Sequence, residues 1–165
     1  SGALGDCLRG AVGMGFFFIM YWATYVFYTI MGDGEVAEGS VWEGAMSGAH
    51  YMLDNLCAVV DRNRLQISGS TENVMHHDDV QARFEAFGWH VIQVDGHDYD
   101  ALAAAFEEAK ATKCRPTLLI ANTVKGCGSA VMENKAAWHH HVPTSEEYEQ
   151  IMSDFTARKE AALHE

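Results

Sequence analysis

The stretch GFFFIMYWATYVFYTIMGDGEVAEG, residues 15–39, joins two patterns that point to different kinds of protein. Its first part belongs to an apolar run, without a charged residue between Gly10 and Gly32, that is long enough to cross a bilayer. Its last part, around Gly32-Asp33-Gly34, is typical of a turn between a strand and a helix that brings backbone amides close to a phosphate or an ion. The organisation of the remaining chain decides which pattern determines the fold.

The apolar run fits a helix followed by a strand. It begins among glycines, which is typical of close helix packing, and it ends in the β-branched and aromatic segment 26–31. Only Arg9 precedes the run and Asp33 follows it at once, so the charge asymmetry expected around a membrane span is weak. We therefore expect a helix over 3–20 and a strand over 26–31, with a membrane-associated protein as the alternative.

The remainder alternates between short apolar segments and longer amphipathic ones. The short segments are rich in β-forming residues and apolar on both faces, as in parallel strands covered by helices on two sides. We expect strands at 56–61, 90–95 and 116–121, and helices at about 38–53, 77–87 and 98–112. This alternation predicts an α/β fold, a doubly wound and mainly parallel sheet, formed by a single domain over 1–165.

Two of the expected helices have a recognisable apolar face. In the segment 98–112 the apolar residues at helical spacing are Leu102, Ala105, Phe106 and Ala109. A final helix is expected after PTSEEYEQ, where Thr144 and Glu147 have the spacing of a capping box. Its apolar stripe consists of Tyr148, Ile151, Met152 and Phe155.

Composition excludes several classes of function. The formal net charge of −12 argues against a nucleic-acid partner, and the 11 Lys and Arg residues are too scattered to bind an anionic membrane surface. The four cysteines form no C-x-x-C pair and are interpreted as reduced thiols of a cytoplasmic protein. Because the sequence starts with Ser1-Gly2 and not with Met, we expect upstream residues to be missing.

The strand ends bring two candidate ligands together. Asp33 follows the first expected strand and Asn63 follows the second, at the edge of a parallel sheet where ligands usually bind. A carboxylate and an amide oxygen suit Mg²⁺, or Ca²⁺ as a substitute, and Mg²⁺ leaves positions for phosphate oxygens. Alone, the Gly-Asp-Gly turn is equally compatible with Asp33 as an ordinary helix cap. The segment 34–40 lacks the lysine of a P-loop, and no G-x-G-x-x-G fingerprint is present.

The spacing of this Gly-Asp-Gly turn and Asn63 resembles the thiamine-diphosphate motif. The surrounding segment GDGEVAEGSVWEGAMSGAHYMLDNLCAVVDRNRLQISG is similar to the cofactor-binding segment of transketolases. The segments FGWHVIQVDGHD, TVKGCG and MENKAAWH also resemble transketolases, especially those made of two separate subunits. The resemblance covers nearly the whole chain and implies the diphosphate-binding part of that family, with thiamine diphosphate and Mg²⁺ as cofactors.

The resemblance also implies roles for individual residues. Metal ligation is implied for Asp33, the side-chain oxygen of Asn63 and the backbone carbonyl of Leu65. Cofactor contacts are implied for Gly2, Ala3, Leu4, Gly34, Asn63 and His139. Glu38 matches an acidic residue of the subunit-interface network, and His139 matches a histidine near the diphosphate and the substrate. Without the resemblance, His139 would be interpreted as a surface histidine.

The implied reaction moves a two-carbon ketol unit from a ketose phosphate to an aldose phosphate. The glutamate that activates the aminopyrimidine lies, in the family, on another domain, so we expect a C-terminal partner subunit or domain and an isolated chain without activity. A deoxyxylulose-phosphate synthase, a two-oxo-acid dehydrogenase component and a non-catalytic or membrane-associated homologue remain as alternatives.

Three departures from the family pattern bear on these roles. Asp6 and Arg9 add charges near the expected cofactor, and His140 replaces a usual glycine. The apolar segment 19–24 stands where relatives have a charged turn.

Overall fold

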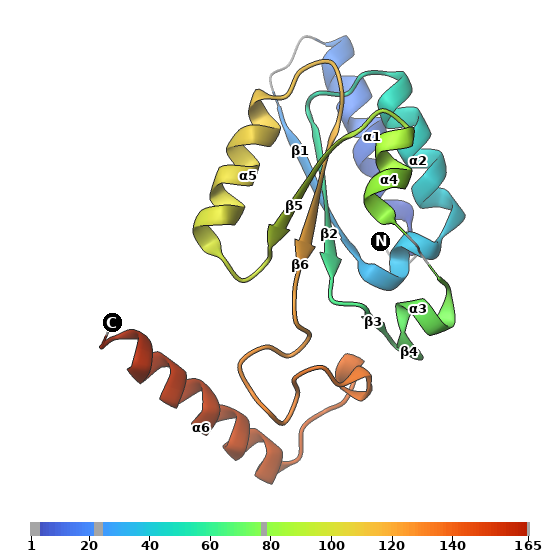
Figure 1. The fold of residues 1–165 in the computed structure, drawn as a ribbon. Helices are drawn as coiled ribbons and strands as arrows, with labels where there is room; N and C mark the ends of the chain where they lie inside the picture. Colours follow the sequence, from blue (N-terminus) through green and yellow to red (C-terminus); the bar gives the residue numbers. More distant parts are fainter. Residues whose placement is uncertain (1–3, 22–24, 77–78, 165) are drawn as a thin grey trace.

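Four parallel strands form the centre of the molecule in the computed structural model, which describes residues 4–21, 25–76 and 79–164. They are β1 (Phe27–Gly32), β2 (Leu56–Arg62), β5 (His90–Asp95) and β6 (Thr117–Asn122), in the spatial order β1-β2-β6-β5 (Figure 1). The first five residues of β2 and of β6 are buried, whereas the edge strands β1 and β5 are only partly covered. The expected parallel sheet is confirmed, and its central strands have the two-sided burial that their composition predicted.

Helices cover both faces of the sheet, although unequally (Figure 1). One face carries α1 (Asp6–Met20), α2 (Gly39–His50) and α4 (Val80–Ala86), and the other carries α5 (Tyr99–Ala111). The larger core lies under the three helices and includes Trp89, which is 2% exposed and donates a 2.8 Å hydrogen bond from Nε1 to the carbonyl of Ala45. The predicted apolar face of α5 is confirmed, since Ala105 and Ala109 pack against β2 and β6.

The apolar run divides as the sequence predicted. Its helix ends at Met20, its strand begins at Phe27, and no helix in the described part of the chain is long and apolar enough to cross a membrane. The turn before α1 depends on Gly5, whose φ of 78° lies in the left-handed region that glycine adopts without strain. Residues 22–24 of the apolar segment lie outside the described ranges.

Short elements lie beyond the carboxyl ends of the strands. They are the 3-10 helix η1 (Asp33–Ala37), the small hairpin of β3 (Leu65–Gln66) and β4 (Gly69–Ser70), the helix α3 (Thr71–Val74) and the 3-10 helix η2 (Ala136–His139). The sequence did not predict them, because elements of two to five residues have no measurable hydrophobic period. Together they surround the carboxyl edge of the sheet.

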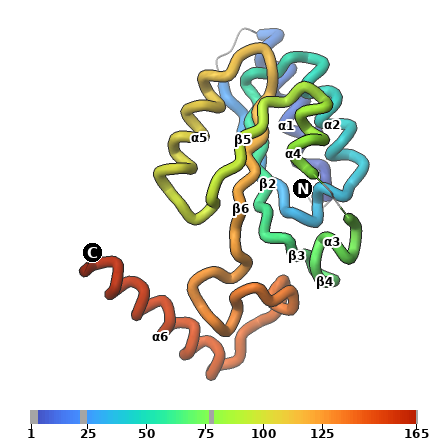
Figure 2. Tube along the Cα trace, in the orientation of Figure 1, coloured from blue at the N-terminus to red at the C-terminus, as the bar shows by residue number. Residues whose placement is uncertain are grey.

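The last helix, α6 (Ser145–Ala162), extends away from the sheet at this same edge (Figures 1 and 2). Its predicted capping box is confirmed: the Thr144 amide donates to Glu147 Oε2 at 2.8 Å, and the Glu147 amide donates to the Thr144 hydroxyl at 3.3 Å. Of its predicted apolar stripe, only Ile151 is buried, and Tyr148, Met152 and Phe155 are exposed. The stripe therefore has the expected spacing but is largely uncovered among the described residues.

Candidate functional site

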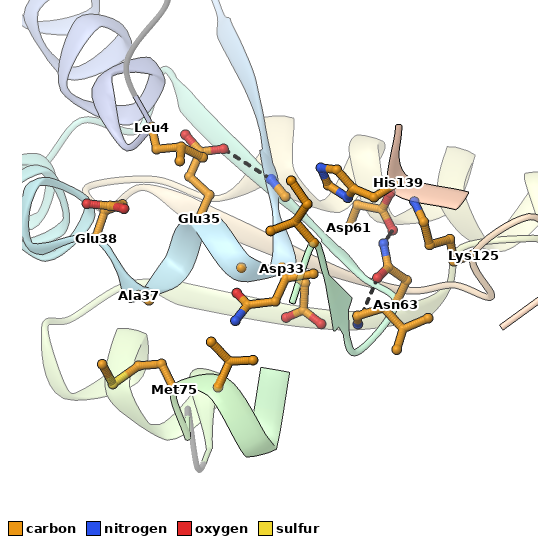
Figure 3. A pocket seen from close by; sticks show the side chains of 16 residues that line it. Leu4, Asp33, Glu35, Ala37, Glu38, Asp61, Asn63, Met75, Lys125 and His139 are labelled. Carbon is orange, nitrogen blue, oxygen red and sulfur yellow. Dashed lines mark hydrogen bonds between the residues drawn. The ribbon is translucent and has the colours of Figure 1, made fainter. Parts of the chain in front are cut away.

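A cavity of about 580 Å³ lies at the carboxyl edge of the sheet, where β1, β2 and the loop after β6 meet (Figure 3). It is lined by residues that follow these three strands, including Asp33, Asn63 and Lys125. These residues are distant in the sequence but adjacent in space because β1, β2 and β6 are neighbours in the sheet. The position agrees with the general rule for ligands of open parallel sheets.

The turn after β1 is held by Glu35. Its carboxylate accepts hydrogen bonds from the amide of Gly32 at 3.2 Å, the amide of Gly5 at 2.8 Å and the thiol of Cys7 at 3.1 Å. These contacts join the start of α1 to η1 and fix the wall of the cavity near Leu4 (Figure 3). Burial and the Glu35 carboxylate raise the pKa of the Cys7 thiol, so this thiol stays protonated and donates.

Gly34 is required by a close approach within the turn. A Cβ atom at this position would lie 2.9 Å from Cβ of Gln66, which belongs to β3. The second glycine of the Gly-Asp-Gly motif therefore allows η1 to pack directly against the segment after β2. This contact brings the two strand ends into one cavity wall.

Asp33 has a fully buried side chain, and both of its carboxylate oxygens have partners. Oδ1 lies 2.5 Å from Nη1 of Arg62, and Oδ2 accepts the backbone N–H of Arg64 at 2.5 Å. Arg62 also contacts Glu72 Oε1 at 3.1 Å through Nη2. Burial disfavours the guanidinium charge, but Asp33 and Glu72 outweigh this effect and hold the Arg62 pKa above its ordinary value.

Asn63 and Leu65 lie beside Asp33 in the cavity lining. The side-chain oxygen of Asn63 accepts the Leu65 amide at 3.0 Å, and its Nδ2 donates to Asp61 Oδ1 at 3.4 Å. Asp61 also accepts the hydroxyl of Thr123 from the loop after β6. This network fixes the orientation of the Asn63 amide at the end of β2.

The expected metal ligands fit Mg²⁺ by their chemistry. A carboxylate, an amide oxygen and a main-chain carbonyl are hard oxygen donors, as Mg²⁺ and Ca²⁺ require. No group of three or more His, Cys, Asp or Glu side chains suited to a metal occurs within residues 4–21, 25–76 and 79–164. That finding is compatible with the expected set, which includes only one such side chain, Asp33.

The structure brings most of the predicted cofactor residues together. Leu4, Gly34, Glu38 and His139 all line the same cavity as Asp33, Asn63 and Leu65. His139 ends η2 and is exposed, next to Lys125 and Asn63, whereas Glu38 lies on the opposite side of the cavity at the start of α2 (Figure 3). Gly2 and Ala3 lie outside the described residues.

Sequence reasoning missed the cation of the cavity. Lys125 is the sole Lys or Arg among the cavity-lining residues of the described chain, which also include four carboxylates, those of Asp33, Glu35, Glu38 and Asp61. Its signal was the TVKGCG segment directly after the last strand, where a lysine reaches the same sheet edge as Asp33 and Asn63. With this excess of acidic groups, a bound phosphate would be repelled unless a cation accompanied it.

The added charges at the start of α1 do not enter the cavity. Arg9 Nη2 lies 3.2 Å from Asp6 Oδ1, and neither residue lines the cavity. The pair is partly exposed, and its two charges offset each other. His140, the other departure, is exposed and directly follows η2.

Residues 1–161 match the protein family described as "Transketolase, thiamine diphosphate binding domain". One of the two subunits of the apulose-4-phosphate transketolase of Phocaeicola vulgatus is 46% identical over 97% of this chain. The transketolase of Mus musculus is 43% identical over 93% of this chain. The chain spans 57% of the length of the bacterial subunit and 24% of the length of the mouse enzyme.

Solved transketolase structures have the same fold. A crystal structure from Campylobacter jejuni superposes with a TM-score of 0.89 at 27% identity, covering 94% of this chain and 26% of that one. A mutant transketolase from Pichia stipitis gives a TM-score of 0.85 at 32% identity, covering 94% of this chain and 24% of that one.

Proposed function

The chain belongs to the transketolase family, as its thiamine-diphosphate-binding part, and on this premise we propose that it holds the Mg²⁺-diphosphate group of that cofactor for ketol transfer. The observation that carries the proposal is the single cavity in which Asp33, Asn63, Leu65 and Lys125 converge from three strand ends. The acidic excess of this cavity is compatible with a phosphate only if a divalent cation is bound with it.

We assign the metal to Asp33, the side-chain oxygen of Asn63 and the carbonyl of Leu65. Gly34, whose lack of a side chain allows close backbone approach, and Lys125 would contact the diphosphate. The bound cofactor supplies the carbon nucleophile of the transfer. His139, exposed at the cavity rim, is placed to hydrogen-bond the phosphate or a hydroxyl group of the substrate, and Leu4 contributes an apolar wall.

We also infer that residues 1–165 form one domain of a larger catalytic assembly. Two relatives, the Phocaeicola vulgatus protein and a 6-deoxy-6-sulfo-D-fructose transketolase subunit from a Clostridium species, are each named as one subunit of a transketolase, and the chain spans 57% and 56% of their lengths. We expect a partner subunit or domain to supply the pyrimidine-binding part, and sugar phosphates to be the substrates. On this basis the isolated chain binds the cofactor weakly and does not turn over substrate.

Native mass spectrometry of the protein purified from its source, followed by calorimetric titration of variants, tests the proposal. We expect a multi-subunit mass that includes thiamine diphosphate, and at least about tenfold weaker Mg²⁺-dependent cofactor binding in Asn63→Ala, equivalent to about 1.4 kcal/mol. Asn122→Ala is the matched control, because Asn122 also ends a strand at this edge but does not line the cavity. A monomer that ignores the cofactor at millimolar Mg²⁺ would overturn the proposal.

A further inference from the structure

The buried carboxylate of Asp33 already has a cation, and this cation comes from the chain itself. The Arg62 side chain is only 11% exposed, and its Nη1 lies 2.5 Å from Oδ1 of a carboxylate with no exposed surface. The Arg64 amide occupies the other oxygen at the same distance. A metal that binds Asp33 must therefore compete with a charge-assisted hydrogen bond made in a dry environment.

Arg62 has a second partner outside the cavity. Its Nη2 contacts Glu72 at 3.1 Å in the first turn of α3, a side chain that is 39% exposed. Arg62 thus connects Asp33 to the segment that contributes Val74 and Met75 to the cavity lining. If Asp33 were taken by a metal, Glu72 would still hold one side of the guanidinium.

A second cavity offers the guanidinium a place to move. It has a volume of about 330 Å³ and is lined by polar groups that include Arg62 itself, Asp79, Gln81 and Asn122. Arg62 does not line the first cavity. The side chain can therefore withdraw from Asp33 without entering the space proposed for the cofactor, and the carboxylate of Asp79 lines the space that it would enter.

We propose that Arg62 is an internal counter-cation that occupies Asp33 in the metal-free protein and is displaced toward Glu72 and the second cavity when the metal binds. This inference rests on the proposed function. Arg62 lowers the affinity for a free divalent cation, because the two positive charges compete for one carboxylate. A diphosphate adds negative charge near the site and favours the exchange, so metal and diphosphate bind cooperatively.

The test is titration of the purified protein with Mn²⁺, followed by electron paramagnetic resonance, with and without inorganic pyrophosphate. We expect Arg62→Gln to bind Mn²⁺ alone about tenfold more tightly than the wild type, and pyrophosphate to improve its affinity less than it improves that of the wild type. Arg62→Lys, which keeps the charge, should stay close to the wild type. Arg64→Gln is the matched control, because Arg64 contacts Asp33 through its main chain.

Glu72→Gln gives an independent readout if Arg62→Gln does not fold. Removing this exposed acceptor leaves Asp33 as the carboxylate that holds Arg62 within the described chain, so Mn²⁺ affinity should fall. Unchanged or weaker Mn²⁺ binding in Arg62→Gln, or tighter binding in Glu72→Gln, would overturn the inference. Failure of the wild type to bind Mn²⁺ with thiamine diphosphate would instead count against the proposed function, and tight binding by Arg62→Gln alone would still support the displacement.

Discussion

At the scale of single residues, Lys125 controls the balance of charge in the cavity. It faces four carboxylates that line the same space, and its neighbours in Figure 3 are Asn63, Asp61 and His139. A phosphate would gain a charge-assisted hydrogen bond from the ammonium group. The lysine therefore favours an anionic ligand in a cavity that would otherwise attract only cations.

Substitution of Lys125 by Met should weaken the binding of thiamine diphosphate while leaving the fold intact. The expected loss is about 1.5–3 kcal/mol, the usual contribution of a hydrogen bond to a charged group. Calorimetric titration at saturating Mg²⁺ measures it. Lys113→Met is the control, because Lys113 is exposed at the opposite edge of the sheet. Equal affinities for the two variants would show that Lys125 does not contact the ligand.

The thiol of Cys57 determines part of the alkaline stability. It is 2% exposed in β2, and burial raises its pKa from 9.0 to about 12. The unfolded chain therefore releases this proton first as the pH rises, so the stabilising contribution is complete below pH 9 and is lost between about pH 9 and 12. In that interval the free energy of unfolding should fall by up to about 1.4 kcal/mol per pH unit because of this group alone.

Urea unfolding of the wild type and of Cys57→Ala at several pH values isolates the effect from that of other titrating groups. The difference in stability between the two proteins should shrink or reverse as the pH rises above 9. A difference that is constant from pH 7 to 11 would contradict the assignment. The exposed Cys114 supplies a control, because Cys114→Ala should show no such trend.

At the scale of secondary-structure elements, the contact between α2 and the segment after α4 holds the larger core together. Trp89 packs edge-on against Phe84, with ring centroids 5.3 Å apart, and donates to the carbonyl of Ala45 in α2. Gly48 on α2 leaves room for the indole, since a Cβ atom there would lie 3.1 Å from Cζ2 of Trp89. The small residues of α2 therefore set the distance between the helix and the indole.

Replacement of Trp89 by Phe should lower the free energy of unfolding by about 1–3 kcal/mol, because a cavity forms and a buried hydrogen bond is lost. Denaturant unfolding followed by circular dichroism measures the change. Trp138→Phe is the control, since Trp138 lies in η2 outside the core. Equal stabilities of the two variants would rule out a structural role for the indole N–H.

The elements also show what the sequence could and could not predict. Each strand of the main sheet was predicted to within one residue, and the capping box of Thr144 and Glu147 marked the start of α6, because these signals depend on local chemistry. In the site, Asp33 and Asn63 could be grouped because strand ends of a parallel sheet share an edge. The partners of Asp33 could not be predicted, because the reach of Arg62 depends on tertiary packing.

At the scale of the whole molecule, the two faces of the sheet are covered unequally. Helix α5 packs against β5, β6 and part of β2, while β1 leaves Tyr28 and Ile30 exposed on the same side, at 47% and 71%. Ile30 is paired in register with Val59 of β2, which is only 9% exposed. One step across the sheet therefore separates an open surface from the core.

This difference predicts unequal costs for the same chemical change. Val59→Thr should destabilise the fold by about 1–3 kcal/mol, because a hydroxyl group is buried among apolar side chains. Ile30→Thr should change stability by less than about 0.5 kcal/mol, as at other exposed sites. Thermal unfolding of both variants tests the comparison. A loss at Ile30 as large as that at Val59 would mean that this face is covered in the protein that was measured.

The unequal roles of the two sheet edges have a consequence for engineering. All the proposed ligand groups follow strand ends, whereas the connections 51–55 and 112–116 enter strands at the far edge and contribute nothing to the cavity. A circular permutant opened at 112–116 would change the order in which the strands are synthesised but keep every cavity residue on its own strand. Loops at one edge can thus be rewritten for a new sugar while those at the other are rewritten for durability.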